Sequence, residues 1–280
     1  MALLVVPATL VVVVLLWAPM LLLARVSLNR FDPIQLMVEA VTFDNYARAV
    51  ADPYYRSVML TTIVVAALCT LVSLVLGFPV AYWLARTRTR FKGLIIIATV
   101  LPLLVGNVVR AAGWVALLGT KGAINVGLMS IGVISVPLEM LYTSGAVVVA
   151  SVAVVLPYMI LALSGVIEAI PRDVEEAASN LGAGALTVAF RVLLPLALPG
   201  VLAGTVLVFI LCMNAYATPV LLGGPSFKMM APAIYDEFVR ANNWPVGASL
   251  AFLLLLTSIV LTVVFGRMLA RRLERTVAHA

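Results

Sequence analysis

The side chains that could carry out chemistry are few, and their types exclude most catalytic sites. His279 is the only histidine in 280 residues, which excludes a histidine-based metal site and a serine–histidine protease. No GxxxxGK[ST] loop occurs, so this chain cannot bind and hydrolyse ATP through a P-loop. We therefore expect no catalytic residue, metal or cofactor in this chain, and an intramembrane enzyme is the least favoured interpretation.

One segment is polar and rich in small residues: EEAASNLGAGALTVAFRVLLPLALPG, at 175–200. Just before it, Asp173 is placed to cap a helix, and Glu176 would complete a capping box. Apolar residues at helical spacing then give one stripe, formed by Val174, Ala177, Ala178 and Leu181. Gly182 is placed to end this helix. So short a helix is marginal by itself, so it must pack against either its own bundle or another protein.

The rest of the chain is apolar enough to lie in a membrane. Hydrophobic residues make up 64% and charged residues 11% of the sequence, with a mean hydropathy of +1.17, whereas soluble proteins are about a quarter charged. Six stretches have the length that a membrane helix needs: roughly 2–28, 57–85, 93–118, 142–167, 200–222 and 246–268. We predict an all-α membrane protein with six transmembrane helices in one bundle and a single domain over residues 1–280.

Positive charges in the short loops predict the orientation. One side has ten Lys and Arg, at 86–92, at 172 and 191, and in the tail from 267, whereas the other has six. The side with ten should be cytoplasmic, which places both termini inside. The first stretch lacks a positive n-region, so we interpret it as a retained span, and whether residues precede it is left open. The net charge of +6 reflects this topology and not nucleic-acid binding.

The polar and small residues inside the predicted spans indicate which transport mechanisms and helix contacts are possible. No span carries Asp or Glu near its middle, which counts against a proton-coupled secondary transporter, although sodium-coupled transporters can rely on backbone oxygens. Cys69 and Cys212 are expected to be packing residues rather than disulfide partners. Gly200 and Gly204 make a GxxxG pair that suits close helix packing.

The polar segment resembles the cytoplasmic EAA loop of type I ABC importer permeases. That pattern is EAA, three residues, Gly, nine residues and Ile-x-Leu-Pro, and here it reads EAA at 176–178, Gly182 and VLLP at 192–195. The resemblance implies a coupling loop at 169–199 whose helix docks on a separate ATP-binding subunit. The residues implied in this coupling are Asp173, Glu176, Ala177, Ala178, Leu181, Gly182 and Pro195. Pro195 and Pro199 would also set the angle at which the fifth span begins.

The resemblance covers nearly the whole chain and is strongest to permeases of the spermidine/putrescine type. It is carried by VTFDNYARAVADPYY (41–55), FPVAYWLAR (78–86), LPLLVGNVVRAAGWVALLGTKGAIN (101–125) and LLGGPSFKMMAPAIYDEFVRANNWPVGASLAF (221–252). It implies one permease subunit of a polyamine importer in the bacterial cytoplasmic (inner) membrane, surrounded by lipid. Implied partners are two copies of a P-loop ATP-binding subunit that holds ATP and Mg, a second permease that is a non-identical sibling, and an extracytoplasmic substrate-binding protein.

Four polar residues within the spans are candidates for the translocation path: Asn107, Arg110, Asn214 and Tyr216. Arg110 lies about 17 residues into the third span, hence in its outer half. Because an Arg in lipid costs about 2.5–3.5 kcal/mol on insertion scales, it should face the bundle, a partner chain or water. It could instead extend outward or pair with a carbonyl or an acid of the partner. Ala215 stands where related permeases often carry Glu, which weighs against a di- or tricationic solute.

Alternatives stay open at this point. The same machinery could import an opine, an aminophosphonate, ferric iron or sulfate, because the binding protein makes the initial selection. A self-contained secondary transporter or channel is a further alternative, against which the loop match and the missing membrane acids both count. The spans are apolar all round, so they do not reveal which faces line the path.

Overall fold

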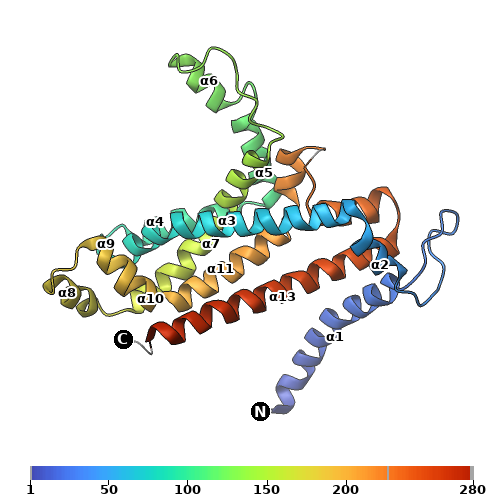
Figure 1. Cartoon of the computed structure of the whole chain (residues 1–280), viewed down its shortest axis with the longest axis horizontal. Helices are drawn as coiled ribbons and strands as arrows, with labels where there is room; N and C mark the ends of the chain where they lie inside the picture. Colours follow the sequence, from blue (N-terminus) through green and yellow to red (C-terminus); the bar gives the residue numbers. More distant parts are fainter. Residues whose placement is uncertain (1, 226, 278–280) are drawn as a thin grey trace. The chain divides into compact units, whose positions relative to one another are not determined.

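The computed structural model describes residues 2–225 and 227–277, and His279 lies outside them. Within these residues the chain is helical, and its β pairing is limited to an isolated bridge between Arg30 and Val38. Figure 1 shows the elements in order: α1 (Ala2–Ser27), α2 (Asp44–Ala51), α3 (Pro53–Arg86), α4 (Lys92–Val100), η1 (Leu101–Leu104), α5 (Asn107–Leu118), α6 (Ala123–Ser130), α7 (Ser144–Ala169), α8 (Arg172–Asn180), α9 (Ala185–Thr187), η2 (Val188–Leu193), α10 (Leu194–Leu196), α11 (Leu198–Met213), η3 (Pro219–Gly223), α12 (Met230–Tyr235), η4 (Asp236–Arg240) and α13 (Trp244–Val277).

Four of the predicted spans are continuous helices in the described residues, namely α1, α3, α7 and α13. Each is long and apolar enough to cross a membrane, over Thr9–Ser27, Pro53–Arg86, Ser144–Ala169 and Trp244–Arg267. Their bounds lie within a few residues of the predicted ones, except that α13 continues to Val277. Hydropathy located these helices because each is one unbroken apolar run.

The third predicted span is not one straight helix, which corrects the prediction for 93–118. Lys92–Leu104 and Asn107–Ser130 meet at 97°. Pro102 lies in the short η1 turn, after which Val105 is extended and Gly106 precedes the first residue of α5. An apolar sequence hides such a break because hydropathy does not report backbone direction.

The fifth predicted span, 200–222, is preceded by a bend and ends earlier than predicted. Ala185–Leu196 and Leu198–Met213 meet at 74°, between Pro195 and Pro199, the two prolines that were expected to set this angle. α11 ends at Met213 rather than at 222, and the chain resumes helical structure only after Tyr216. The described residues therefore hold four spans, or six if each bent pair is one span.

Contacts divide the chain into two compact units, which are described separately. The first comprises residues 1–60 and 229–257. Its helix α1 is exposed around most of its length, with Leu15, Trp17 and Leu22 exposed at 68%, 61% and 68%. The segment after α1 is tied to α2 by Asn45, whose Nδ2 donates 2.8 Å hydrogen bonds to the carbonyl oxygens of Ser27 and Asn29.

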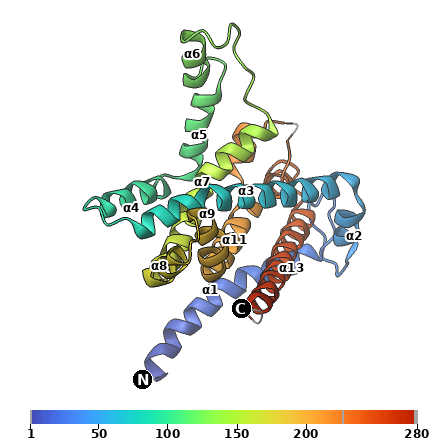
Figure 2. The same ribbon diagram turned by 60° about the vertical axis from the view of Figure 1, so that its left-hand side comes forward.

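The second unit comprises residues 61–228 and 258–280. Its core lies between α7 and α11, which run side by side in both views (Figures 1 and 2). A Cβ added at Gly200 would lie 2.9 Å from Val166 Cβ, and one at Gly204 would lie 2.8 Å from Met159 Sδ. The GxxxG pair therefore permits the close approach expected from the sequence. Figure 2 also shows α5 and α6 extending away from this core.

Candidate functional sites

The polar segment contains a helix, α8, whose start differs from the prediction. Asp173 is not its N-cap and the capping box does not form, because the helix already begins at Arg172, with Pro171 in the N-cap position and no side-chain cap. Pro171 suits this position because its φ is fixed. Asp173 lies instead in the first turn, where a negative charge still favours the helix dipole.

The end of α8 is the one that the sequence predicted. Gly182 has a φ of +87°, which favours glycine. Its N–H donates to the Ser179 carbonyl at 2.9 Å, and the Ala183 N–H donates to the Ala178 carbonyl at 3.1 Å. This pair of bonds is the Schellman arrangement, so the chain turns sharply back after α8.

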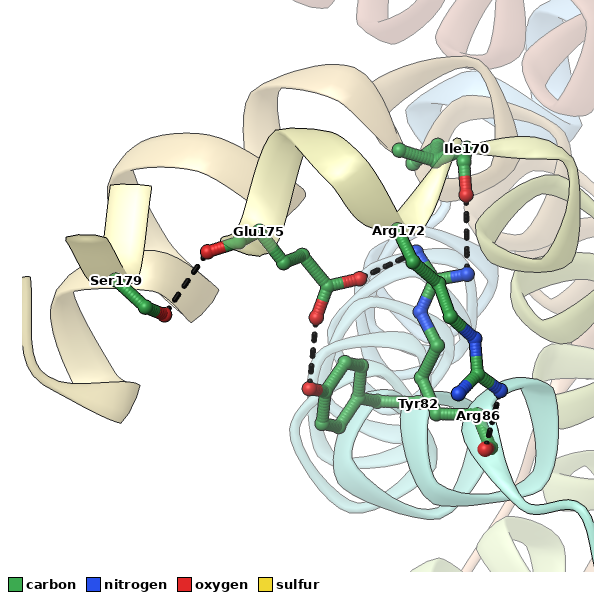
Figure 3. A network of polar contacts seen from close by, with 6 residues as sticks. All are labelled: Tyr82, Arg86, Ile170, Arg172, Glu175 and Ser179. Atoms are coloured by element: carbon green, nitrogen blue, oxygen red, sulfur yellow. Dashed lines mark hydrogen bonds and ion pairs between the residues drawn. The ribbon is translucent and has the colours of Figure 1, made fainter. Parts of the chain in front are cut away.

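One face of α8 is fastened to the end of α3 by a polar network (Figure 3). The Glu175 carboxylate forms an ion pair with Arg86 and accepts a 2.9 Å hydrogen bond from the Tyr82 hydroxyl. The Arg86 and Glu175 side chains are only 13% and 14% exposed. Arg86 Nη1 donates to the Ile170 carbonyl at 3.0 Å, and Arg172 Nη2 donates to the Arg86 carbonyl at 2.6 Å. The network therefore joins α3, the end of α7 and α8.

Sequence reasoning missed this network. It gave Glu175 no partner, and it used Arg86 and Arg172 only to predict orientation. Tyr82 is 93 residues from Glu175 in the chain, so no local spacing links them. The one available signal was opposite charge: an arginine ends the second span and an acid opens the EAA helix.

The other face of α8 is apolar and exposed. Leu181 is 90% exposed and Val174 is 36% exposed, and Ala177 is also exposed. Further along the same loop, Leu186 and Phe190 are exposed at 75% and 63%. The helix is thus held from one side by charges and presents apolar side chains on the other.

The four path candidates line one cavity of about 450 Å³, formed by α5, α7 and the segment from α11 to η3: Asn107, Arg110, Asn214 and Tyr216. Arg110 Nη2 donates to Asn107 Oδ1, and its Nη1 lies 3.5 Å from the Val154 carbonyl. Its Nε is buried without a hydrogen-bond partner among the described residues. Arg110 is therefore held beside the cavity by a neighbouring amide and a backbone carbonyl.

The cavity lies where two helices are interrupted. Asn107 opens α5 directly after the 97° bend, and Asn214 follows the last residue of α11. Interrupted helices in transporters leave backbone polar groups free to face a solute. The depth predicted for Arg110 was counted along a straight helix, and such a count does not measure depth across a 97° turn.

Other polar residues that line the cavity were not singled out from the sequence: Ser151, Tyr158 and Thr218. Tyr158 follows Pro157 in a largely apolar helix, and this was the one signal that could have identified it. Among the described residues that line the cavity, Arg110 is the only charged one and none is acidic.

Residues 70–275 match the family model described as a binding-protein-dependent transport system inner membrane component. The chain belongs to this family, the permease subunits of ABC importers. Its fold is similar to that of a bacterial ABC transporter involved in the import of the acidic polysaccharide alginate, with a TM-score of 0.79 over 96% of this chain and 94% of that chain, at 15% identity. The crystal structure of an alginate transporter with a pentasaccharide-bound periplasmic protein gives a TM-score of 0.78 over 96% and 93% of the two chains, at 16% identity.

Curated relatives at higher identity include polyamine permeases. The chain is 33% identical over 257 residues to the spermidine/putrescine transport system permease protein PotB of Escherichia coli, covering 92% of this chain and 90% of the relative. It is 32% identical over 259 residues to PotB of Haemophilus influenzae, covering 91% and 90%. The molybdenum transport system permease protein ModB of Azotobacter vinelandii is 33% identical over 199 residues, covering 68% and 86%.

Proposed function

We propose that this chain is one permease of an ATP-driven, binding-protein-dependent importer and that α8 is its coupling helix. The observation that carries the proposal is the two-sided character of α8. Its Glu175 side is fastened to α3, whereas Leu181 on its apolar side is 90% exposed. An exposed apolar surface on so short a helix calls for a partner. The Glu176–Gly182 segment, with its small residues, would lie in a groove of the ATP-binding subunit.

The network around Arg86 supplies a physical route for coupling. ATP and Mg are bound by two copies of the ATP-binding subunit, whose movement displaces α8. Arg86 is bonded both to Glu175 and to the Ile170 carbonyl, so a displacement of α8 reaches α3 and α7 together. These helices then move as a rigid body between outward-facing and inward-facing states.

The cavity beside Arg110 is proposed as this chain's half of the translocation path. A second permease, expected to be a non-identical sibling, would supply the other half, and an extracytoplasmic binding protein would deliver the solute. Six spans with both termini in the cytoplasm fit the Lys and Arg distribution, and nucleic acid is not an expected partner.

The cargo proposed first is a polyamine, on the strength of the PotB relatives. An opine, aminophosphonate, ferric iron or sulfate remains the alternative. The cavity favours the anionic members of this group, such as sulfate, but not ferric iron, because Arg110 is cationic and none of the described lining residues is acidic. If the cargo is a polyamine, the acids that bind it would have to come from the sibling permease.

The test of coupling is the substitution Leu181→Asp, which places a charge at the centre of the proposed docking surface. We expect at least about a tenfold loss of recovered ATP-binding subunit and of uptake, because burying an unpaired carboxylate at an interface costs more than about 1.4 kcal/mol. The matched control is Thr89→Asp, an exposed loop residue outside α8.

The measurement is affinity purification of the full chain from its native membrane, with ATP hydrolysis assayed against polyamines and the alternative solutes. Recovery of a P-loop ATPase and a second permease, both lost in the Leu181 variant, would support the proposal. Wild-type uptake by that variant, or recovery of the chain alone without ATPase activity, would favour a self-contained secondary transporter.

A further inference from the structure

A second polar cavity, of about 420 Å³, lies in the same compact unit and takes no part in the proposed solute path. It is formed by the end of α3, the start of α4, the end of α7 and the start of α8. Four cationic side chains line it, against one acid: Arg86, Arg88, Lys92 and Arg172, with Glu168. We call it the basic pocket.

The basic pocket keeps positive charge that its own acids do not neutralise. Arg86 is paired with Glu175, and Lys92 Nζ lies 2.7 Å from Glu168 Oε1. Within the described residues Arg88 and Arg172 form no ion pair, and the one hydrogen bond of the Arg172 guanidinium goes to the Arg86 carbonyl. The pocket therefore carries two guanidinium groups that no acid neutralises, which suits an anion.

The position of the pocket indicates where the anion comes from. Arg86 ends the Pro53–Arg86 span, Ala169 ends the Ser144–Ala169 span, and Lys92 begins the next bent pair. Three helix ends thus place the pocket at the depth of the lipid headgroups. Next to it on α4, Leu94 and Ile97 are exposed at 64% and 59%, which suits contact with acyl chains.

We propose that the basic pocket binds the phosphate of an anionic phospholipid. Arg and Lys side chains between membrane helices are suited to such headgroups, and a guanidinium can bind phosphate oxygens through two parallel hydrogen bonds. Arg88 and Arg172 hold the phosphate, while the acyl chains lie along α4. A zwitterionic lipid also carries a phosphate, but its ammonium group meets the same cations and is repelled.

The bound lipid would stabilise the contacts at the start of α8. Arg86 and Arg172 line the pocket and also hold α8 in place. A phosphate beside them reduces the repulsion between these cations and so favours the anchored position of α8. The lipid site itself depends on membrane insertion and on local charge, so it stands whether or not α8 docks on an ATPase.

The test uses Arg88→Gln in the full-length protein, because Arg88 lies outside the network that holds α8. Native mass spectrometry counts the adducts formed as dioleoyl phosphatidylglycerol is titrated into the purified protein, with dioleoyl phosphatidylcholine as the zwitterionic probe. The matched control is Arg90→Gln, since Arg90 lies two residues away and stacks on the Phe91 ring without lining the pocket. Arg88→Lys keeps the charge.

We expect wild type and Arg90→Gln to retain phosphatidylglycerol in preference to phosphatidylcholine. Arg88→Gln should bind it about fivefold more weakly, as a loss of about 1 kcal/mol per basic residue implies, and Arg88→Lys should restore most of the affinity. Equal retention by the Arg88→Gln and Arg90→Gln variants would overturn the site. Saturable binding of inorganic phosphate that depends on Arg88, without selective lipid retention, would overturn the lipid as its occupant.

Discussion

The surroundings of α8 and the cavity beside Arg110 use polar side chains in opposite ways. At α8 the charges face inward and are paired, with Arg86 and Glu175 almost fully covered, while the apolar side chains face outward. At the cavity the framework is apolar, and the amide and guanidinium groups border open space. Paired charges fix one geometry, so they suit a part that transmits force. Polar groups that border a cavity can change partners, so they suit a part that a solute must enter and leave.

The largest effect is expected from breaking the ion pair that holds α8. Glu175→Gln leaves Arg86 almost buried without its carboxylate, and breaking a buried pair in this way costs about 3–5 kcal/mol. We expect uptake to fall at least about tenfold at matched protein levels. The loop 169–199 should also become more sensitive to limited proteolysis.

A suitable control for that variant is Asp44→Asn, which removes an ion pair with Arg30 whose two side chains are 71% and 70% exposed. Such a pair is worth about 1 kcal/mol or less. If Glu175→Gln transported at the wild-type rate with an unchanged loop, the paired charges would not be what holds α8.

The next largest effect is expected at the cavity beside Arg110. Ala215→Glu adds a carboxylate to a cavity in which the described lining residues include no acid. It should shift the selectivity of uptake toward cationic solutes by about tenfold, equivalent to about 1.4 kcal/mol. Competition between labelled putrescine and an anionic solute measures this ratio. Ala215→Gln has nearly the same size without the charge and should leave the ratio unchanged; an equal shift in both variants would point to a steric cause.

A smaller effect is expected where α7 packs against α11, because both helices extend from the loop 169–199 toward the cavity. Gly200→Ala places a Cβ 2.9 Å from Val166 Cβ and 3.2 Å from the Ala162 carbonyl, neither of which can easily move. Overpacking of this kind costs about 1–3 kcal/mol.

Its matched comparison is Gly204→Ala, whose new Cβ meets the flexible Met159 side chain at Sδ, 2.8 Å away. Met can rearrange, so we expect a smaller loss of thermal stability in detergent than for Gly200→Ala. The reverse order, measured as midpoints of thermal unfolding, would mean that α7 and α11 do not pack at the spacing described.

The smallest effect returns to α8. Tyr82→Phe removes only the 2.9 Å hydrogen bond to Glu175 and leaves the ion pair with Arg86. We expect a loss of about 1 kcal/mol in local stability, seen as faster hydrogen exchange at the backbone amides of α8. An effect as large as that of Glu175→Gln would assign the anchoring to the hydroxyl rather than to the charge pair.

The sequence predicted what is encoded locally. Four spans, the α8 helix and its end at Gly182 follow from apolar length, helical spacing and a glycine, and all are present. The bend at Gly106 lies inside 93–118 and changes the direction of the backbone without changing hydropathy, so this stretch was predicted as one straight helix. The bend between Pro195 and Pro199 lies before 200–222, and the departure inside that stretch is the end of α11 at Met213. Only the proline pair gave a sign of its bend.

The candidate site residues show the same contrast between local sequence features, which were recognised, and long-range contacts, which were not. The four path candidates were found because polar residues stand out in an apolar span, and the structure brings all four to one cavity. Tyr158 and Thr218 were missed because a single hydroxyl residue in a helix is usually a packing residue. The Tyr82–Glu175–Arg86 network was missed because its members are far apart in the chain and no short-range pattern predicts contacts across that separation.

Helix α1 is the part of this chain that could most readily be exchanged with the corresponding helix of a relative. Its side chains are exposed along almost the whole apolar stretch, so they contribute little packing energy to their own chain. Membrane insertion requires only apolar length from such a helix, so its sequence can drift or be replaced by another span of equal length. What restricts that drift is the short polar attachment after it, through Asn45, and the surface of whichever chain lies against it. A hybrid permease with a first helix taken from a relative should therefore fold, and its success in assembly would measure how much partner recognition α1 carries.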